Sequence, residues 1–136
     1  LTMEITYSKD PSIDLKQVMA LYKQSFKESP RPIHDINQIQ RMFLCSNLLV
    51  SAWDKDQLVG VCRCFSDFSY VTYICDLAVH ENYQNKKIGQ TLIEMVKTES
   101  GKSCKIVLLS NKKANSFYPH IGFSSHDRAW VIDPQE

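Results

Sequence analysis

Hydrophobic positions recur at helical spacing in three stretches of the chain and form short β-prone runs in six others. Two of the helical stretches begin at residues 10–12 and behind Asp35, and the prolines of segment 29–32 separate them. The third covers residues 88–99. The predicted strands cover residues 4–7, 48–53, 58–65, 70–79, 105–110 and 128–132.

With a short helix before the last strand, these elements follow the order β-α-α-β-β-β-α-β-α-β. A meander of strands followed by a βαβ unit predicts an α/β fold with a mixed, mostly antiparallel sheet and helices on both faces. The length fits one domain, which we place at residues 3–136. Leu1 and Thr2 precede Met3 and are interpreted as remnants of cloning.

The junction between the strand ending at Val79 and the next helix is suited to hold an anion. The first turn of a helix has N–H groups without an intrahelical partner, and the helix dipole adds positive charge there. Gly89 has no Cβ, so a ligand can approach the backbone, and Lys86 and Lys87 add two cations. Taken alone, the segment also fits an ordinary turn with solvated lysines.

A second segment favours the functional interpretation. Residues 111–123 match the pattern Asn…Ala-x-x-Phe-Tyr-x-x-x-Gly-Phe at Asn111, Ala114, Phe117, Tyr118, Gly122 and Phe123. Residues 84–89 follow Ala78-Val79 and match Gln/Arg-x-x-Gly-x-Gly/Ala, except that Lys87 replaces the first glycine. In this order, the two segments resemble the GNAT (general N-acetyltransferase) superfamily.

The resemblance implies an N-acetyltransferase that transfers the acetyl group of acetyl-coenzyme A (acetyl-CoA) to a primary amine of a small molecule. It assigns Tyr118 as the general acid for the leaving thiolate and the N–H of Val79 as the donor to the carbonyl oxygen. The positions it implies for coenzyme A are Leu77, Ala78, Val79, Gln84, Asn85, Lys86, Lys87, Ile88, Gly89, Gln90, Asn111, Asn115 and Tyr118.

Lys87 keeps other functions open. A lysine is unfavourable if the loop needs a positive φ at this position, but it is not if the helix has already begun. Its side chain can also reach a phosphate directly. A non-catalytic acyl-CoA-binding regulatory module therefore remains an alternative, as does a protein lysine or N-terminal acetyltransferase.

The acceptor amine is predicted to bind between the first two helices and the strands. The residues expected to line its site are Phe26, Ile33, Arg63, Phe65 and Tyr73. Their aromatic share favours an apolar or arylalkyl amine, whereas Arg31 or Arg63 would suit a phosphate or carboxylate. The general base stays open among His80, Glu81 and Asp76, and strand alternation places Asp76 on the face opposite Leu77.

Composition excludes several other classes. A formal charge of +1 argues against a nucleic-acid binder, and no apolar run reaches the length of a membrane span. The five cysteines have no metal-ligand spacing, so we expect no metal and free thiols in a reducing cytoplasm. A homodimer is common among soluble proteins and is the partner we expect besides the small amine.

Overall fold

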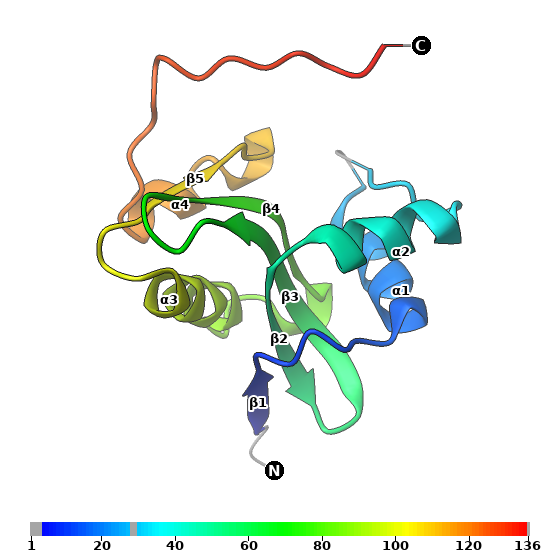
Figure 1. Cartoon of the computed structure of the whole chain (residues 1–136). Helices are drawn as coiled ribbons and strands as arrows, with labels where there is room; N and C mark the ends of the chain where they lie inside the picture. The colour runs from blue at the N-terminus through cyan, green and yellow to red at the C-terminus, as the bar shows by residue number, and fades with distance from the viewer. Residues whose placement is uncertain (1–3, 28–29, 136) are drawn as a thin grey trace.

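The computed structural model describes residues 4–27 and 30–135, and its five-stranded sheet has the order β1-β2-β3-β4-β5 (Figure 1). Neighbouring strands pair antiparallel from β1 to β4, and β5 runs parallel to β4. The strands are β1 (Ile5–Ser8), β2 (Leu48–Asp54), β3 (Gln57–Ser66), β4 (Val71–Val79) and β5 (Lys105–Leu108). The predicted α/β class is therefore confirmed.

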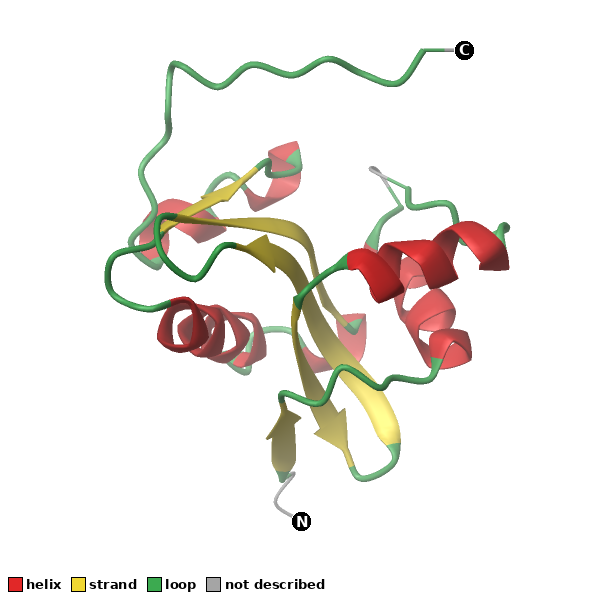
Figure 2. Cartoon of the chain, viewed as in Figure 1, coloured by secondary structure: helices red, strands yellow, loops and turns green. Residues whose placement is uncertain are grey.

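Helices cover both faces of this sheet, as the sequence predicted (Figure 2). Helices α1 (Leu15–Ser25) and α2 (Ile36–Cys45) lie on one face, and α3 (Ile88–Ser100) lies on the other. The described residues also form a short helix α4 (Phe117–His120) and the 3-10 turns Glu81–Tyr83 and Lys112–Ala114.

Helix α1 begins later than the sequence predicted, at Leu15 rather than at residues 10–12. The carboxylate of Asp14 accepts a hydrogen bond from the backbone N–H of Lys16 at 2.9 Å and so caps the helix. Asp10 instead accepts from the N–H of Ser12 at 2.9 Å, a local turn that competes with helix formation. Asp35 caps α2 as predicted, by accepting from the N–H of Gln38.

Each face of the sheet has its own hydrophobic core. Leu92, Ile93 and Val96 of α3 pack on one face, and Val18 and Leu21 of α1 pack on the other. Helix α3 approaches the sheet closely at Gly60, where a Cβ would lie 3.1 Å from both Ile88 Cγ2 and Leu92 Cδ1.

A β-bulge in β4 redirects its side chains. The register shifts between the pairs Arg63↔Asp76 and Cys64↔Ile74, so Cys75 has no direct partner on β3. As a result, Ile74 packs in the α3 core while Asp76, two residues later, points toward α1. Leu77 packs against the α3 core, so the prediction that Asp76 and Leu77 lie on opposite faces was correct.

The predicted strand at residues 128–132 is absent, and this prediction was wrong. Residues 124–135 contain no helix or strand and extend away from the body of the domain (Figure 1). The segment has a β-prone sequence, but a strand forms only when its backbone groups find a neighbouring strand.

Candidate active site

The strands β4 and β5 part beside the first turn of α3. Their parallel pairing ends at Ile74↔Leu108, where β5 stops, while β4 continues to Val79. The N–H of His80 donates to the carbonyl of Val59 on β3 at 2.8 Å. Since backbone groups alternate in direction along a strand, those of Leu77 and Val79 face the open side. The carbonyl of Val79 accordingly lies near the Oγ of Ser25 (3.4 Å) and the Nε2 of Gln84 (3.3 Å) rather than within the ladder.

The loop after β4 leads into the N-terminus of α3 through two residues with positive φ, Asn85 (64°) and Lys87 (64°). Lys87 is the N-cap of α3, and its side chain makes no capping hydrogen bond. The first helical bond runs from the N–H of Thr91 to the carbonyl of Lys87. The N–H groups of the first turn, from Ile88 to Gln90, therefore have no helical acceptor, as an anion site requires.

Of the two conformations that the sequence left open for Lys87, a positive φ or a helical backbone, the structure has the positive φ, which is unfavourable for lysine. At φ 64° and ψ 18° it lies in the left-handed region, where a residue with a Cβ is strained. Its side chain and that of Lys86 are exposed at the mouth of the loop. The loop therefore has, at Lys87, the positive φ that a glycine adopts easily, although the residue is a lysine.

Gly89 brings the two sequence motifs together. A Cβ at this position would lie 3.5 Å from Phe117 Cζ, 3.6 Å from Val79 Cγ2 and 3.9 Å from Leu77 Cδ2. These are ordinary contact distances, so the protein itself does not require glycine here. Because Phe117 belongs to the second motif, the turn of α3, the open edge of β4 and α4 meet at one place.

Tyr118 lies on α4 beside this meeting point. Its ring makes edge-on contacts with the rings of Phe117 (5.1 Å between centroids) and Phe123 (5.4 Å). The backbone then reverses at Gly122, whose φ of 102° favours glycine. Burial, with a smaller contribution from Cys62, raises the pKa of Tyr118 to about 12, so its phenol is protonated at neutral pH.

The two asparagines of the second motif make local hydrogen bonds. Asn111 Oδ1 accepts from the N–H of Lys113 at 2.8 Å and caps the 3-10 turn. Asn115 Oδ1 accepts from the hydroxyl of Ser110 at 2.6 Å. Both therefore hold the loop that follows β5. We call residues 77–90 together with 111–123 the α3 side of the site.

A buried charge cluster occupies the other side of β4. The carboxylate of Asp76 is 1% exposed and accepts from Arg31 Nε and Arg63 Nε, each at 2.6 Å. The hydroxyl of Tyr22 donates to it at 2.9 Å. Burial, aided by the charge of Asp76, raises the pKa of Tyr22 well above its usual value. Burial alone would lower the pKa of Arg63, but Asp76 outweighs this effect and raises it.

This cluster joins the elements around the expected acceptor site. Arg63 Nη1 contacts the carbonyl of Met42 in α2 at 3.3 Å, and its guanidinium lies 5.6 Å from the ring of Phe43. Arg31 Nη2 donates to the carbonyl of Cys75 in the bulge at 3.1 Å and stacks on the ring of Phe26. Sequence analysis missed the cluster, although a lone acidic residue inside an apolar strand was a signal for it.

A cavity of about 520 Å³ lies between α1 and α2, next to Arg31. Of the predicted acceptor residues, Phe26 and Ile33 line it. Arg63 does not, because its side chain is buried against Asp76. Phe65 and Tyr73 are also outside this lining and form a cross-strand pair that is partly exposed. We call this cavity with the Asp76 cluster the α1 side of the site.

The candidate bases differ in accessibility. Asp76 is enclosed by its arginines, whereas Glu81 is exposed and lies 4.0 Å from Lys27 Nζ. His80 Nδ1 accepts from the N–H of Asn82 at 3.1 Å. Asp76 is therefore not placed to take a proton from a substrate in the cavity.

Other predicted features concern metals, thiols and membranes. All five cysteines are free. In the described part of the chain, no three His, Cys, Asp or Glu side chains gather as a metal site would require. Among the described helices, none has the length and apolar character needed to cross a membrane.

The acetyltransferase (GNAT) family model matches residues 15–123. An uncharacterized N-acetyltransferase, ycf52, from Gracilaria tenuistipitata var. liui is 28% identical over 98 residues, which are 68% of this chain and 53% of that protein. The chain thus spans about half the length of this curated relative. Since the family model covers most of the chain, the chain belongs to the GNAT acetyltransferase family.

Solved structures share the fold. A probable acetyltransferase from meticillin-resistant Staphylococcus aureus has a TM-score of 0.78 at 22% identity, over 98% of this chain and 100% of that one. The structure of AAC(6')-Iy, in complex with the bisubstrate analogue CoA-S-monomethyl-acetylneamine, has a TM-score of 0.72 at 14% identity and covers 97% of this chain and 99% of that one. These likenesses concern the fold alone.

Proposed function

We propose that the chain is an N-acetyltransferase that moves the acetyl group of acetyl-CoA to a primary amine of a small molecule. The observation that carries the proposal is the open edge of β4 beside the unpaired N–H groups of α3. Family membership supports acetyl-CoA as the donor. If the domain is part of a longer protein, we propose the same activity for that protein.

The α3 side fits coenzyme A group by group. The N–H groups from Ile88 to Gln90 suit its pyrophosphate, with Lys86 and Lys87 at the rim. The backbone of Leu77 and Val79 suits the amide groups of its pantetheine arm, which can pair like a strand. The proposal also includes four polar residues that border these positions and are predicted to contact coenzyme A: Gln84, Asn85, Asn111 and Asn115.

Acetyl-CoA supplies an activated acetyl thioester, and the chain's residues orient and stabilise its reacting atoms. The amine nitrogen forms a bond to the carbonyl carbon while the carbon–sulfur bond breaks. The N–H of Val79 faces the open side and is proposed to hold the carbonyl oxygen, on which negative charge develops. Tyr118 is proposed as the general acid for the sulfur.

The raised pKa defines what Tyr118 can do. A phenol with a pKa of about 12 remains protonated, but it is a weaker acid than a thiol, whose pKa is about 8.5. Its role is therefore to donate a hydrogen bond to the sulfur as negative charge appears, and to pass on a proton as the amine releases one. The proton that the thiolate gains is then balanced by the proton that the amine loses.

The α1 side supports a small amine of low positive charge. Lys23, Lys27, Arg31 and His34 line the cavity, and among its described lining residues none is acidic. Such surroundings lower the pKa of a bound ammonium and favour the neutral amine that attacks the carbonyl. They disfavour polycationic acceptors such as the neamine derivative bound to AAC(6')-Iy. No strong base is then needed in the cavity.

The test is thermal unfolding with acetyl-CoA and with pantetheine, which lacks the pyrophosphate, followed by thiol release with a panel of amines. Acetyl-CoA at about 100 times its Kd should stabilise the fold by about 2.7 kcal/mol, a shift of several degrees. We expect little shift with pantetheine and thiol release with monoamines. Binding without transfer to any amine would favour the regulatory module, and absence of binding would overturn the proposal.

A further inference from the structure

The cavity between α1 and α2 combines an apolar wall with basic side chains at its mouth. The wall is formed by Phe26, Pro32 and Ile33. The exposed side chains that we call the basic rim are Lys23, Lys27 and His34. A volume of about 520 Å³ suits a small molecule. A ligand that matches this lining has an apolar body and a group that accepts hydrogen bonds from cations.

Positive charge around this cavity exceeds negative charge. Two guanidinium groups, those of Arg31 and Arg63, share the single carboxylate of Asp76, so their cluster keeps a net positive charge. Arg31 also lines the cavity. Among the described residues, no ion pair includes Lys23, which lies on the last turns of α1. A bound anion would offset this excess.

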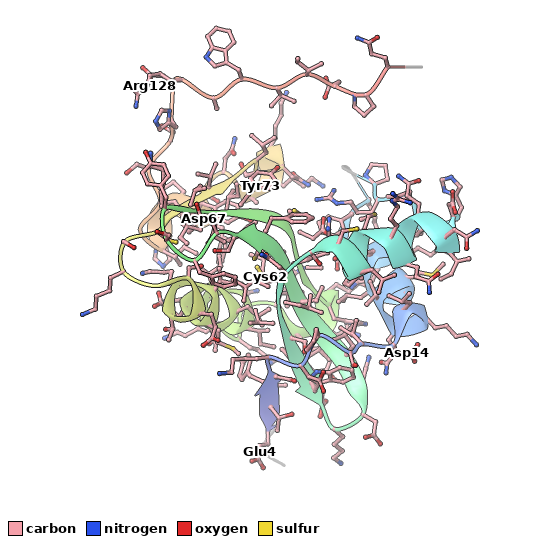
Figure 3. All side chains as sticks on the ribbon, viewed as in Figure 1. Glu4, Asp14, Cys62, Asp67, Tyr73 and Arg128 are labelled. Carbon is pink, nitrogen blue, oxygen red and sulfur yellow. The ribbon has the colours of Figure 1, made fainter. Side chains whose placement is uncertain are left out.

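The carboxylates on neighbouring segments do not supply the missing negative charge. Asp14 caps the N-terminal end of α1, away from the cavity (Figure 3), and Asp35 caps the N-terminus of α2. Glu81 lies 4.0 Å from Lys27, and none of these three carboxylates is part of the described lining. Glu28 lies outside the described residues. The described lining is therefore basic, and a ligand can supply the opposite charge.

The cavity adjoins the place where the acetyl group is proposed to react. Ser25 Oγ, on the last turn of α1, lies 3.4 Å from the carbonyl oxygen of Val79. The next residue, Phe26, lines the cavity. Lys23 lies three residues before Phe26, a spacing that places two side chains on the same side of a helix. A small molecule lying along Phe26 can therefore have one end near Val79 and the other at the basic rim.

We propose that the acceptor is a monoamine whose apolar body carries an acidic group, a carboxylate or a phosphate, and that the basic rim binds this acid. The inference rests on the proposed function, because it takes the cavity as the acceptor site. The amine lies toward Val79, the body lies against Phe26, and the acid lies at Lys23 and Lys27. Hydrogen bonds between these cations and the acid are stronger than those between neutral groups.

The experiment compares amines of nearly equal shape that differ in charge. Thiol release from acetyl-CoA is measured with para-(aminomethyl)benzoate, with the corresponding phenylphosphonate, and with the neutral para-(aminomethyl)benzamide. We expect kcat/KM for one of the two acids to exceed that for the benzamide about tenfold, and the better acid identifies the group. At about 1 M salt, where the screening length is about 3 Å, this ratio should fall.

Charge variants locate the acid at the basic rim. Lys23→Glu should lower the ratio of acid to benzamide about tenfold, to near one, and Lys23→Gln should give an intermediate ratio. Lys102→Glu is the matched control, because Lys102 is exposed in the turn after α3 and outside the cavity lining. It should keep the wild-type ratio. A ratio between two amines is not changed by a loss of folded protein, which lowers both rates equally.

Calorimetry without acetyl-CoA measures binding of the same three amines separately from transfer. We expect the preferred acid to bind more tightly than the benzamide, and Lys23→Glu to remove this difference. Selective binding of the acid without thiol release from any amine would contradict the proposed transferase but support an acid-binding cavity. Turnover with equal kcat/KM for all three amines would overturn the acidic acceptor and leave the transferase. A preference that survives Lys23→Glu unchanged would overturn the role of the basic rim.

Discussion

On the α3 side of β4 the site is formed by backbone groups, whereas on the α1 side it is held by buried charged side chains. The first-turn N–H groups of α3 and the open edge of β4 depend on chain direction and on where β5 ends. The Asp76 cluster depends on side chains from α1, β3 and segment 30–35 meeting at one carboxylate. The α3 side should therefore tolerate side-chain changes better than the α1 side does.

The largest expected effect tests the α1 side. Asp76→Asn removes the negative charge between Arg31 and Arg63 and leaves buried cations uncompensated. We expect a loss of about 3–5 kcal/mol in the free energy of unfolding, measured with urea. Asp127→Asn, at an exposed residue of segment 124–135, is the control and should change it little. A loss below about 1 kcal/mol for Asp76→Asn would remove the contrast between the two sides.

Tyr118→Phe tests the one side chain to which the α3 side assigns chemistry. It removes the phenol but keeps the ring between Phe117 and Phe123. We expect kcat for thiol release to fall about 100-fold, or about 2.7 kcal/mol, with an unchanged KM for acetyl-CoA. Tyr70→Phe, at an exposed tyrosine, should be silent. Unchanged turnover in Tyr118→Phe would exclude the assigned role.

The titration of Tyr118 gives a third test. Its pKa is raised from 10.0 to about 12 in the folded protein, so the unfolded chain releases this proton first as the pH rises. Its stabilising contribution is complete below pH 10 and is lost by about pH 12. We expect wild type to lose about 2 kcal/mol more than Tyr118→Phe across this window, measured by urea unfolding. Parallel curves would contradict the burial of the phenol.

Gly89→Ala separates folding from ligand binding on the α3 side. The new methyl meets its neighbours at ordinary distances, and alanine favours a helix, so the free energy of unfolding should hold or rise by up to about 1 kcal/mol. Affinity for acetyl-CoA should fall about tenfold, or about 1.4 kcal/mol, because the methyl occupies the place where ligand and backbone meet. Equal affinity by calorimetry would show that the ligand does not approach Gly89.

Lys87→Gly has the smallest expected effect and tests the strained N-cap. Relief of the left-handed conformation should raise the free energy of unfolding by up to about 1 kcal/mol, partly offset by greater freedom of the unfolded chain. Lys86→Gly is the matched control, because Lys86 has no positive φ and the change should destabilise slightly. Acetyl-CoA affinity should be retained in Lys87→Gly, since the N–H groups remain. A less stable Lys87→Gly would contradict the strain.

The sequence predicted the backbone elements of the α3 side because each of them is local. The strand to Val79, the helix after Lys87 and the reversal at Gly122 follow from short segments, and the structure brings them together as expected. On the α1 side the sequence indicated Phe26 and Ile33, but it assigned Arg63 to the substrate rather than to Asp76. The partners of Asp76 are 13, 45 and 54 residues away, which no local pattern can connect.

The sequence by itself determined the order of helices and strands as far as α4, and the helix N-terminus that follows the strand ending at Val79, because these depend on periodicity and chain direction. The tertiary structure decided that Ile74 and Asp76, two residues apart, lie on opposite faces, since the bulge at Cys75 resets the alternation of β4. It also decided the fate of residues 128–132, which have the composition of a strand but no neighbouring strand in the described chain. A strand depends on a partner, and local sequence does not specify where that partner lies.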